Sequence, residues 1–260
     1  MRLTVLGCGT STGVPVIGCS CPVCRSTDPR DRRLRTSLLI EEGSRRLVID
    51  SGPDFRAQAL RQALDTVDGV LYTHGHADHV LGLDDLRPLS FRRGIDIWAE
   101  KNVLEQLNRM FPYAFVPGDG MNSRPKLREH VIQEGERFEA SGFEILPLRV
   151  VHGKDSILGF RVGRAAWITD CNEIPQVSQD LLKGLDVLFL DGLQERSHPT
   201  HFNFEQAVVM AQKLGAGQTY LIHIGHEIRY KDLLKRLPAG IEPAWDGLTW
   251  EDKKAKKNRL

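Results

Sequence analysis

The sequence predicts an α/β protein built as a four-layer αββα sandwich, in which two β-sheets face each other and helices cover their outer faces. Two observations favour this fold. Short β-like runs occur in two batches along the 260-residue chain, and each batch includes helical patterns. No stretch rich in proline, glycine or serine divides the batches. We therefore expect one domain over residues 1–250, with all elements packed in shared layers.

The individual elements follow from local hydrophobic periodicity. In the first batch we expect strands at residues 3–6, 38–41, 47–49 and 69–72, and helices at residues 55–65 and 102–110. In the second batch we expect strands at residues 143–151, 158–162, 165–168, 187–190 and 219–222, and helices at residues 204–213 and 230–237. The least regular segment, residues 112–128, is interpreted as a surface loop or a lid.

The composition excludes several classes of protein. The chain has 35 Lys and Arg against 34 Asp and Glu, and 41% of its residues are hydrophobic, as in soluble globular proteins. No apolar run approaches the roughly 20 residues that cross a bilayer, and the N-terminus lacks a signal-peptide core. We therefore expect a cytoplasmic protein that does not bind membranes. Its oligomeric state is left open, with a homodimer as one option.

Basic residues are concentrated in the last ten positions. We interpret residues 251–260 as a basic, disordered tail. The rest of the chain is then slightly acidic, which makes nucleic acid an unfavourable partner.

Three of the five cysteines form a cluster. An odd number of cysteines without a secretory signal indicates a reducing compartment, where such a cluster favours metal binding over disulfides. Cys19, Cys21 and Cys24 supply three thiolates, one ligand short of a closed tetrahedral zinc site. We therefore predict a structural Zn²⁺ bound by the loop of residues 18–26 and by a distant fourth donor. The alternative is a turn with three surface thiols.

The most informative motif is HxHxDH at residues 74–79. A strand that ends at Thr73 would present His74 and His76 on the same side, because side chains alternate along a strand. A turn into a helix at Asp78 and His79 would bring two more donors over the site. Two imidazoles on one side, with a carboxylate and an imidazole on the other, suit two adjacent cations.

Three further donors follow predicted strands, namely His152, Asp170 and His223. Each of them alone is more often a local hydrogen-bonding residue than a ligand. Together they are what a dinuclear site at the rim of a sheet requires, because loops at strand ends can converge there.

These motifs resemble those of the metallo-β-lactamase superfamily of hydrolases. Within it the chain resembles the carbon–phosphorus lyase accessory branch, which hydrolyses phosphoribosyl 1,2-cyclic phosphate. The resemblance covers nearly the whole chain, and includes LGCGTSTGVP at residues 6–15, VIDSGPD at 48–54, HPTH at 198–201 and TYLIHIGH at 219–226.

The resemblance implies a role for each donor. One metal would be held by His74, His76 and His152, and the other by Asp78, His79 and His223, with Asp170 bridging both. His226 would be the fourth ligand of the structural Zn²⁺. Imidazoles tolerate zinc whereas carboxylates and phosphate favour manganese, so the active-site pair is expected to be Mn²⁺ or Zn²⁺.

Asp170 is followed by Cys171, and alternation allows only one of these neighbours to face the site. We favour Asp170, because a bridging ligand needs two donor oxygens, and we interpret Cys171 as a small core residue.

The implied reaction is hydrolysis of a small cyclic phosphodiester, because a metal pair activates water and binds phosphate oxygens. Asp78 and Asp170 count as catalytic through the metals. The resemblance places a general acid at His201, with two alternatives: His201 caps the helix from residue 204, or His198 is the donor. Asp50 is expected to hold the backbone of the HxHxDH segment or one of its histidines in place. The alternative is that it only forms a turn before Ser51.

A second phosphate on the substrate would need a cationic clamp. The arginines at positions 30, 32, 33 and 35 are candidates, and Arg35 is preferred. The alternative is a solvated run of charge.

Three other functions remain open. A transfer-RNA 3′-processing nuclease would need a basic arm, which the sequence lacks. A non-hydrolytic protein of quinone-cofactor biosynthesis would not need the acid His201. A lactamase or thioester hydrolase is disfavoured by the segments around His201 and His226.

Overall fold

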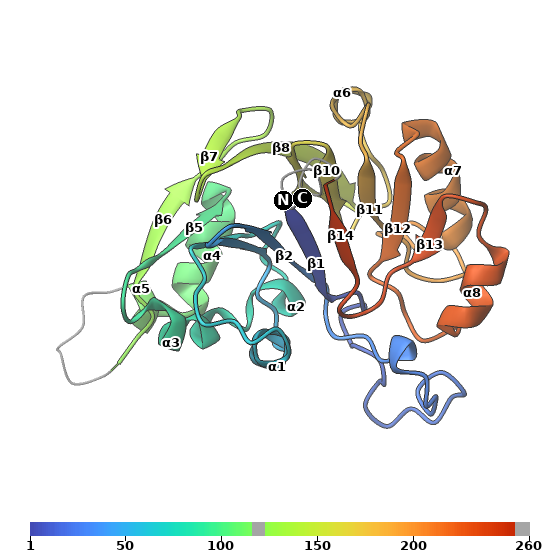
Figure 1. Cartoon of the computed structure of the whole chain (residues 1–260), viewed down its shortest axis with the longest axis horizontal. Helices are drawn as coiled ribbons and strands as arrows, with labels where there is room; N and C mark the ends of the chain where they lie inside the picture. Colours follow the sequence, from blue (N-terminus) through green and yellow to red (C-terminus); the bar gives the residue numbers. More distant parts are fainter. Residues whose placement is uncertain (116–122, 253–260) are drawn as a thin grey trace, which may run out of the picture.

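Two seven-stranded sheets form the centre of the molecule, and the expected four-layer sandwich is confirmed. The computed structural model describes residues 1–115 and 123–252. The first sheet has the order β14-β1-β2-β3-β4-β5-β6 and the second the order β13-β12-β11-β10-β9-β8-β7. Helices lie on the outer sides of the two sheets, α1 to α5 beside the first and α7 and α8 beside the second (Figure 1).

The first sheet comprises β1 (Arg2–Gly7), β2 (Ser37–Glu42), β3 (Arg45–Ile49), β4 (Gly69–Leu71), β5 (Ile95–Ala99), β6 (Leu127–Val131) and β14 (Thr249–Glu251). The second comprises β7 (Phe138–Ala140), β8 (Phe143–His152), β9 (Asp155–Val162), β10 (Ala165–Ile168), β11 (Val187–Asp191), β12 (Gln218–Ile222) and β13 (Ile241–Pro243). The helices are α1 (Phe55–Arg61), α2 (Ala77–Val80), α3 (Arg87–Ser90), α4 (Lys101–Met110), α5 (Pro112–Phe115), α6 (Gln176–Leu181), α7 (Phe204–Leu214) and α8 (Tyr230–Arg236), with 3₁₀ turns at η1 (Pro29–Asp31) and η2 (Leu83–Leu86).

Three apolar clusters fill the spaces between the layers. The central one joins the inner faces of both sheets and includes Val5 and Ile40 from the first and Phe160 and Trp167 from the second, all nearly inaccessible. The other two lie between each sheet and its helices. Burial of these side chains from both sides is what holds two sheets face to face.

Strand direction brings the site residues to one rim. Strands β3 to β6 run parallel, and so do β10 to β13. In a parallel sheet the carboxyl ends of neighbouring strands share an edge, and residues that follow them lie in adjacent loops. The segments after β3, β4, β10, β11 and β12 therefore meet where the functional residues are found.

The structure adds elements that periodicity did not indicate. The edge strand β6 is mostly exposed and polar, so it carries no hydrophobic pattern. In the irregular segment 112–128, α5 and the start of β6 are ordered elements, and residues 116–122 lie outside the described residues. Glu251 pairs with Arg2 in β14, so the sheet extends one residue into the predicted tail, whose residues 253–260 are not described.

None of the helices in the described part of the chain combines the length and apolar character needed to cross a membrane.

Candidate metal centres

The HxHxDH segment leaves the first sheet directly after β4 and enters α2. β4 ends at Leu71, before Thr73, because the Thr73 N–H donates to Asp50 Oδ1 (2.9 Å) instead of to a neighbouring strand. His76 is the N-cap of α2, which carries Asp78 and His79 in its first turn. The predicted turn into a helix is therefore present.

The predicted donors converge in two groups. Ligand atoms in each group lie within 4.8 Å of one another. The first group contains His74, His76 and His152, and the second contains Asp78, His79, Asp170 and His223.

Asp170 links the two groups. Its Oδ1 lies 3.3 Å from His79 Nε2, and its Oδ2 lies 3.3 Å from His223 Nε2. The same Oδ2 is 3.9 Å from His74 Nε2, in the first group. The carboxylate therefore faces donors of both groups, which is the position that a bridging ligand needs.

The chemistry of these residues fits a pair of bound metal ions. The Nε2 atoms of His74, His79 and His223 are buried and have no hydrogen-bond partner among the described residues. An unsatisfied buried polar atom costs roughly 1–3 kcal/mol, so three of them around one carboxylate require a compensating ligand. Imidazole and carboxylate donors at this spacing suit divalent cations.

The backbone is strained where donors leave the strands. Asp50, Asp170 and His223 have φ angles of 60°, 54° and 58°, in the left-handed region that non-glycine residues seldom adopt. They follow β3, β10 and β12, so each turns out of its strand at the rim. Strain of about 1–3 kcal/mol per residue persists where packing and function fix the conformation.

Asp50 supports the segment of residues 73–79 through hydrogen bonds. It is fully buried, and its Oδ2 accepts hydrogen bonds from Thr73 Oγ1 (2.9 Å) and His79 Nδ1 (2.7 Å). Because a carboxylate only accepts, His79 carries its proton on Nδ1 and turns Nε2 toward Asp170. Asp50 thus holds both the loop backbone and a histidine.

The other imidazoles are oriented in the same way. His152 Nδ1 donates to the Thr200 carbonyl (2.9 Å), which turns its Nε2 to the site. Burial lowers the pKa of His74 and of His152, which favours the neutral rings that bind metals. Burial opposes ionisation of Asp170, but the charges of His223 and His79, when these rings are protonated, outweigh it and hold the pKa of this carboxyl well below its usual value.

His201 lies at the edge of the donor cluster and is held by a carboxylate. Its Nδ1 is 3.0 Å from Asp191 Oδ2, and its ring stacks on that of His223 with 4.6 Å between centroids. The alternative that His201 caps the following helix is wrong, because Asn203 is the N-cap of α7 and forms a capping box with Gln206. His198 contacts Thr200 and lies 5.1 Å from the His201 ring.

Asp191 is the site residue that the sequence interpretation missed. It is fully buried, and its Oδ2 also accepts the N–H of Cys171 (3.0 Å). Cys171 itself is a buried core residue, and burial raises the pKa of its thiol. Asp191 ends β11, so the strand-end signal that singled out Asp170 would have found it.

Three of the four arginines of residues 30–35 have internal partners, whereas Arg32 is exposed. Arg33 is 1% exposed and donates to the carbonyls of Gly225 and Ile228, so it is not available to a phosphate. Arg35 pairs with Asp54 at 3.1 Å and also donates to the Ser11 carbonyl.

Arg30 pairs with Asp28 and lies over the ring of Tyr230. A phosphate clamp by Arg35 stays a prediction.

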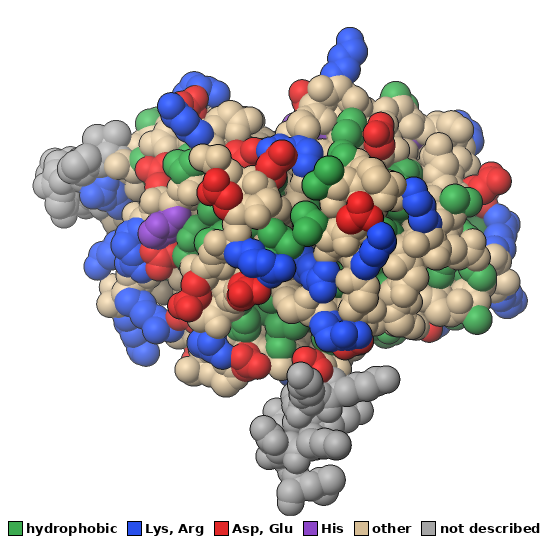
Figure 2. Space-filling model, turned by 90° about the horizontal axis from the view of Figure 1, so that it is seen from above, with side chains coloured by type: hydrophobic (Ala, Val, Ile, Leu, Met, Phe, Trp, Pro, Cys, Tyr) green, Lys and Arg blue, Asp and Glu red, His purple; other side chains and the backbone are tan. Residues whose placement is uncertain are grey.

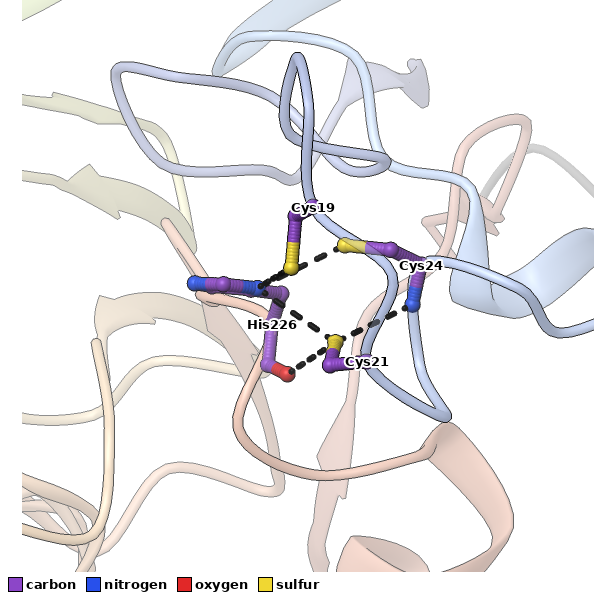
Figure 3. A group of neighbouring side chains, drawn as sticks. All are labelled: Cys19, Cys21, Cys24 and His226. Atoms are coloured by element: carbon purple, nitrogen blue, oxygen red, sulfur yellow. Dashed lines mark hydrogen bonds between the residues drawn. The ribbon is translucent and has the colours of Figure 1, made fainter.

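The cysteine loop meets the segment after β12. The thiols of Cys19, Cys21 and Cys24 point at the ring of His226 from three sides (Figure 3). Their Sγ atoms lie 3.4, 3.5 and 3.4 Å from His226 Nδ1. A tetrahedral zinc with Zn–S of about 2.3 Å and Zn–N of about 2.0 Å separates sulfur and nitrogen by about 3.5 Å. The four side chains thus fit a closed zinc site.

The electrostatics of the cluster favour a thiolate at Cys21, whereas burial raises the pKa of Cys24 to about 11. Burial acts to raise the pKa of Cys21, but hydrogen bonds from the Cys24 N–H and from His226 lower it to about 6. A thiolate at neutral pH is the form that binds metal.

Comparison with known proteins identifies the class. Residues 45–224 match a family model described as a β-lactamase superfamily domain, and the chain belongs to this superfamily. A crystal structure of a diphosphatase from the PhnP family superposes with a TM-score of 0.90 and 44% identity, over 96% of this chain and 97% of that one. The chain is a member of the PhnP family, and its domain is that of a metal-dependent hydrolase.

Two further relatives extend the comparison. The octanoyltransferase of Porphyromonas gingivalis is 41% identical over 255 residues, which are 95% of this chain but 51% of that protein. The chain thus spans about half of that relative. Zn²⁺-bound PqqB from Methylobacterium extorquens shares the fold, with a TM-score of 0.80 and 21% identity over 97% of this chain and all of that one.

The cysteine cluster can be tested by metal content. We expect Cys21→Ala to remove about one zinc per chain and to lower the free energy of unfolding by roughly 3 kcal/mol or more, because the tetrahedral ligand set becomes incomplete. Elemental analysis and thermal unfolding measure both effects. Ile17→Ala is the control, since Ile17 directly precedes the loop of residues 18–26 and is 95% exposed. Unchanged zinc content in Cys21→Ala would exclude the site.

Proposed function

We propose that this chain is a dinuclear phosphodiesterase that cleaves a P–O bond in a small phosphorylated substrate, such as a cyclic phosphodiester. The observation that carries the proposal is the position of Asp170 between two groups of metal donors, with His201 beside them. The proposed ligands are His74, His76 and His152 for one metal and Asp78, His79 and His223 for the other, with Asp170 shared. When bound, Mn²⁺ or Zn²⁺ supplies Lewis acidity toward phosphate oxygens and toward water.

The chain's own contribution is to hold donors and to move a proton. Asp50 and Thr200 fix His79 and His152 so that their Nε2 atoms face the site. Asp191 accepts from His201 Nδ1, which leaves Nε2 as the nitrogen that faces a substrate. Protonated there, His201 donates the proton to the leaving alkoxide. Asp191 acts through His201 and is a positioning residue.

A diphosphate bond is the second candidate for the scissile linkage. The PhnP-family relative at 44% identity is described as a diphosphatase. A diphosphate ester and a phosphodiester both present a disubstituted phosphate, so the same metals and acid would serve either. Product analysis separates them: a diphosphate with organic groups on both phosphates yields two phosphomonoesters, one with a single organic group yields a phosphomonoester and inorganic phosphate, and a cyclic diester opens to a single phosphomonoester.

Surface charge supports a small substrate over nucleic acid. Basic and acidic side chains are interspersed over the face seen in Figure 2. Many arginines have carboxylate partners, as in the pairs Arg46–Asp65 and Arg128–Asp96. Nucleic-acid binding needs an excess of unpaired basic groups to displace counterions.

The dinuclear site is tested by removing one ligand. We expect His76→Ala to lower kcat/KM for bis-p-nitrophenyl phosphate with added Mn²⁺ by about 10³-fold or more, because one metal loses a donor. The control is His130→Ala: His130 is a half-exposed histidine on β6 that stacks on Trp98 outside both groups, and its loss should leave the rate unchanged. Full activity of His76→Ala would refute the proposal.

The proton donor is tested with leaving groups of different basicity. We expect His201→Ala to lower kcat about 10²–10⁴-fold for alkyl diesters, whose alkoxides need a proton, and much less for nitrophenyl diesters. Asp191→Asn should show the same trend more weakly, since it only misorients the ring. Equal losses for both kinds of substrate would show that His201 is not the acid.

A further inference from the structure

A cavity of about 360 Å³ opens beside the first donor group. His74, His76 and His152 form one side of it, and its other walls include Asn102 from α4 and Lys154 and Ser156 from the β8–β9 hairpin. Its volume is in the range of small-molecule sites. A substrate whose scissile phosphate lies at the metal donors would extend into this space.

Lys154 is the one cationic side chain in the wall of this cavity. It is exposed, and within residues 1–115 and 123–252 it forms no ion pair. The other long charged side chain in the wall, Glu100, is already neutralised by two hydrogen bonds from Arg149, of 2.9 and 2.7 Å. The ammonium group is therefore available to an anion that enters the cavity.

The backbone that carries Lys154 is held in place next to the metal donors. It follows Gly153, whose φ of 65° forms the tight turn between β8 and β9. The Gly153 N–H donates to Asn172 Oδ1 (2.6 Å), and a Cβ on Gly153 would lie 2.6 Å from Thr200 Cγ2. A turn anchored on two sides lowers the entropic cost of binding through its side chain.

We propose that Lys154 binds a second phosphate of the substrate, remote from the scissile bond, while the body of the substrate occupies the cavity. This inference rests on the proposed function. It places the second phosphate at the β8–β9 turn instead of at Arg35, which is engaged by Asp54. The neutral donors Asn102 and Ser156 in the wall suit a hydroxyl-bearing body such as a sugar.

The test compares 2′,3′-cyclic nucleotides with and without a 5′-phosphate. For Lys154→Gln we expect KM for the 5′-phosphorylated substrate to rise about tenfold more than KM for the unphosphorylated one, since one charge-assisted contact is lost. The effect should lie in KM and not in kcat, because the remote phosphate is bound equally in ground and transition states. Lys154→Arg should retain most of the preference.

Two neighbouring variants sharpen the result. Asp155 lines the same cavity as a carboxylate, so Asp155→Asn should lower KM for the phosphorylated substrate. Lys101→Gln is the matched control: Lys101 is a 79% exposed lysine at the start of α4, outside the cavity wall, and its loss should leave both KM values unchanged. Equal KM changes for both substrates in Lys154→Gln would overturn the inference.

A binding experiment separates the two proposals. Calorimetric titration with ribose 5-phosphate measures the phosphate subsite without turnover, and Lys154→Gln should weaken its affinity about tenfold. Binding that depends on Lys154, in a protein that cleaves no diester, would refute the proposed function but support the subsite. Diester cleavage with binding insensitive to Lys154 would refute the subsite alone.

Discussion

Contacts of the Asp170 carboxylate with three imidazoles are the constraint on which the rest of the structure depends. Those rings come from the loop after β4, from α2 and from the end of β12, so elements of both sheets must deliver them to one point. Two sheets packed face to face let loops from each close over a shared rim.

The cysteine cluster is connected to the Asp170 site through the segment that follows β12. His226 comes three residues after His223, and the Ile224 N–H between them donates to the Cys8 carbonyl (2.9 Å). The buried Arg33, which also belongs to the N-terminal segment, donates hydrogen bonds to the carbonyls of Gly225 and Ile228. The N-terminal segment therefore fixes the chain that directly follows the left-handed His223. A zinc ion there would stabilise the conformation of a metal ligand at the other site.

The parts of the site that the sequence could predict are those with a local signature. The spacing of residues 74–79 and the polar residues after apolar runs locate the donors without tertiary information. Arg33 could not be assigned in this way, because its role comes from carbonyls distant in the chain, whereas Asp191 carries the same strand-end signal as Asp170 and was overlooked. The same limit explains β6, whose exposed side chains leave no hydrophobic pattern although its backbone pairs with β5.

The metal donors and the wall of the neighbouring cavity differ in how firmly the fold holds them. Five of the seven proposed metal donors are buried, and two of them, Asp170 and His223, have a strained backbone, so these donors have little freedom to change without loss of the fold. The cavity wall is built differently: Asn102 and Lys154 are exposed and lie on a helix and a turn, where substitution costs little stability. On the proposed function, the chemistry is fixed by the core, and substrate choice is set by side chains that the fold does not need. Selectivity among phosphate esters should reside in residues such as Lys154, which sequence motifs for metal binding do not include.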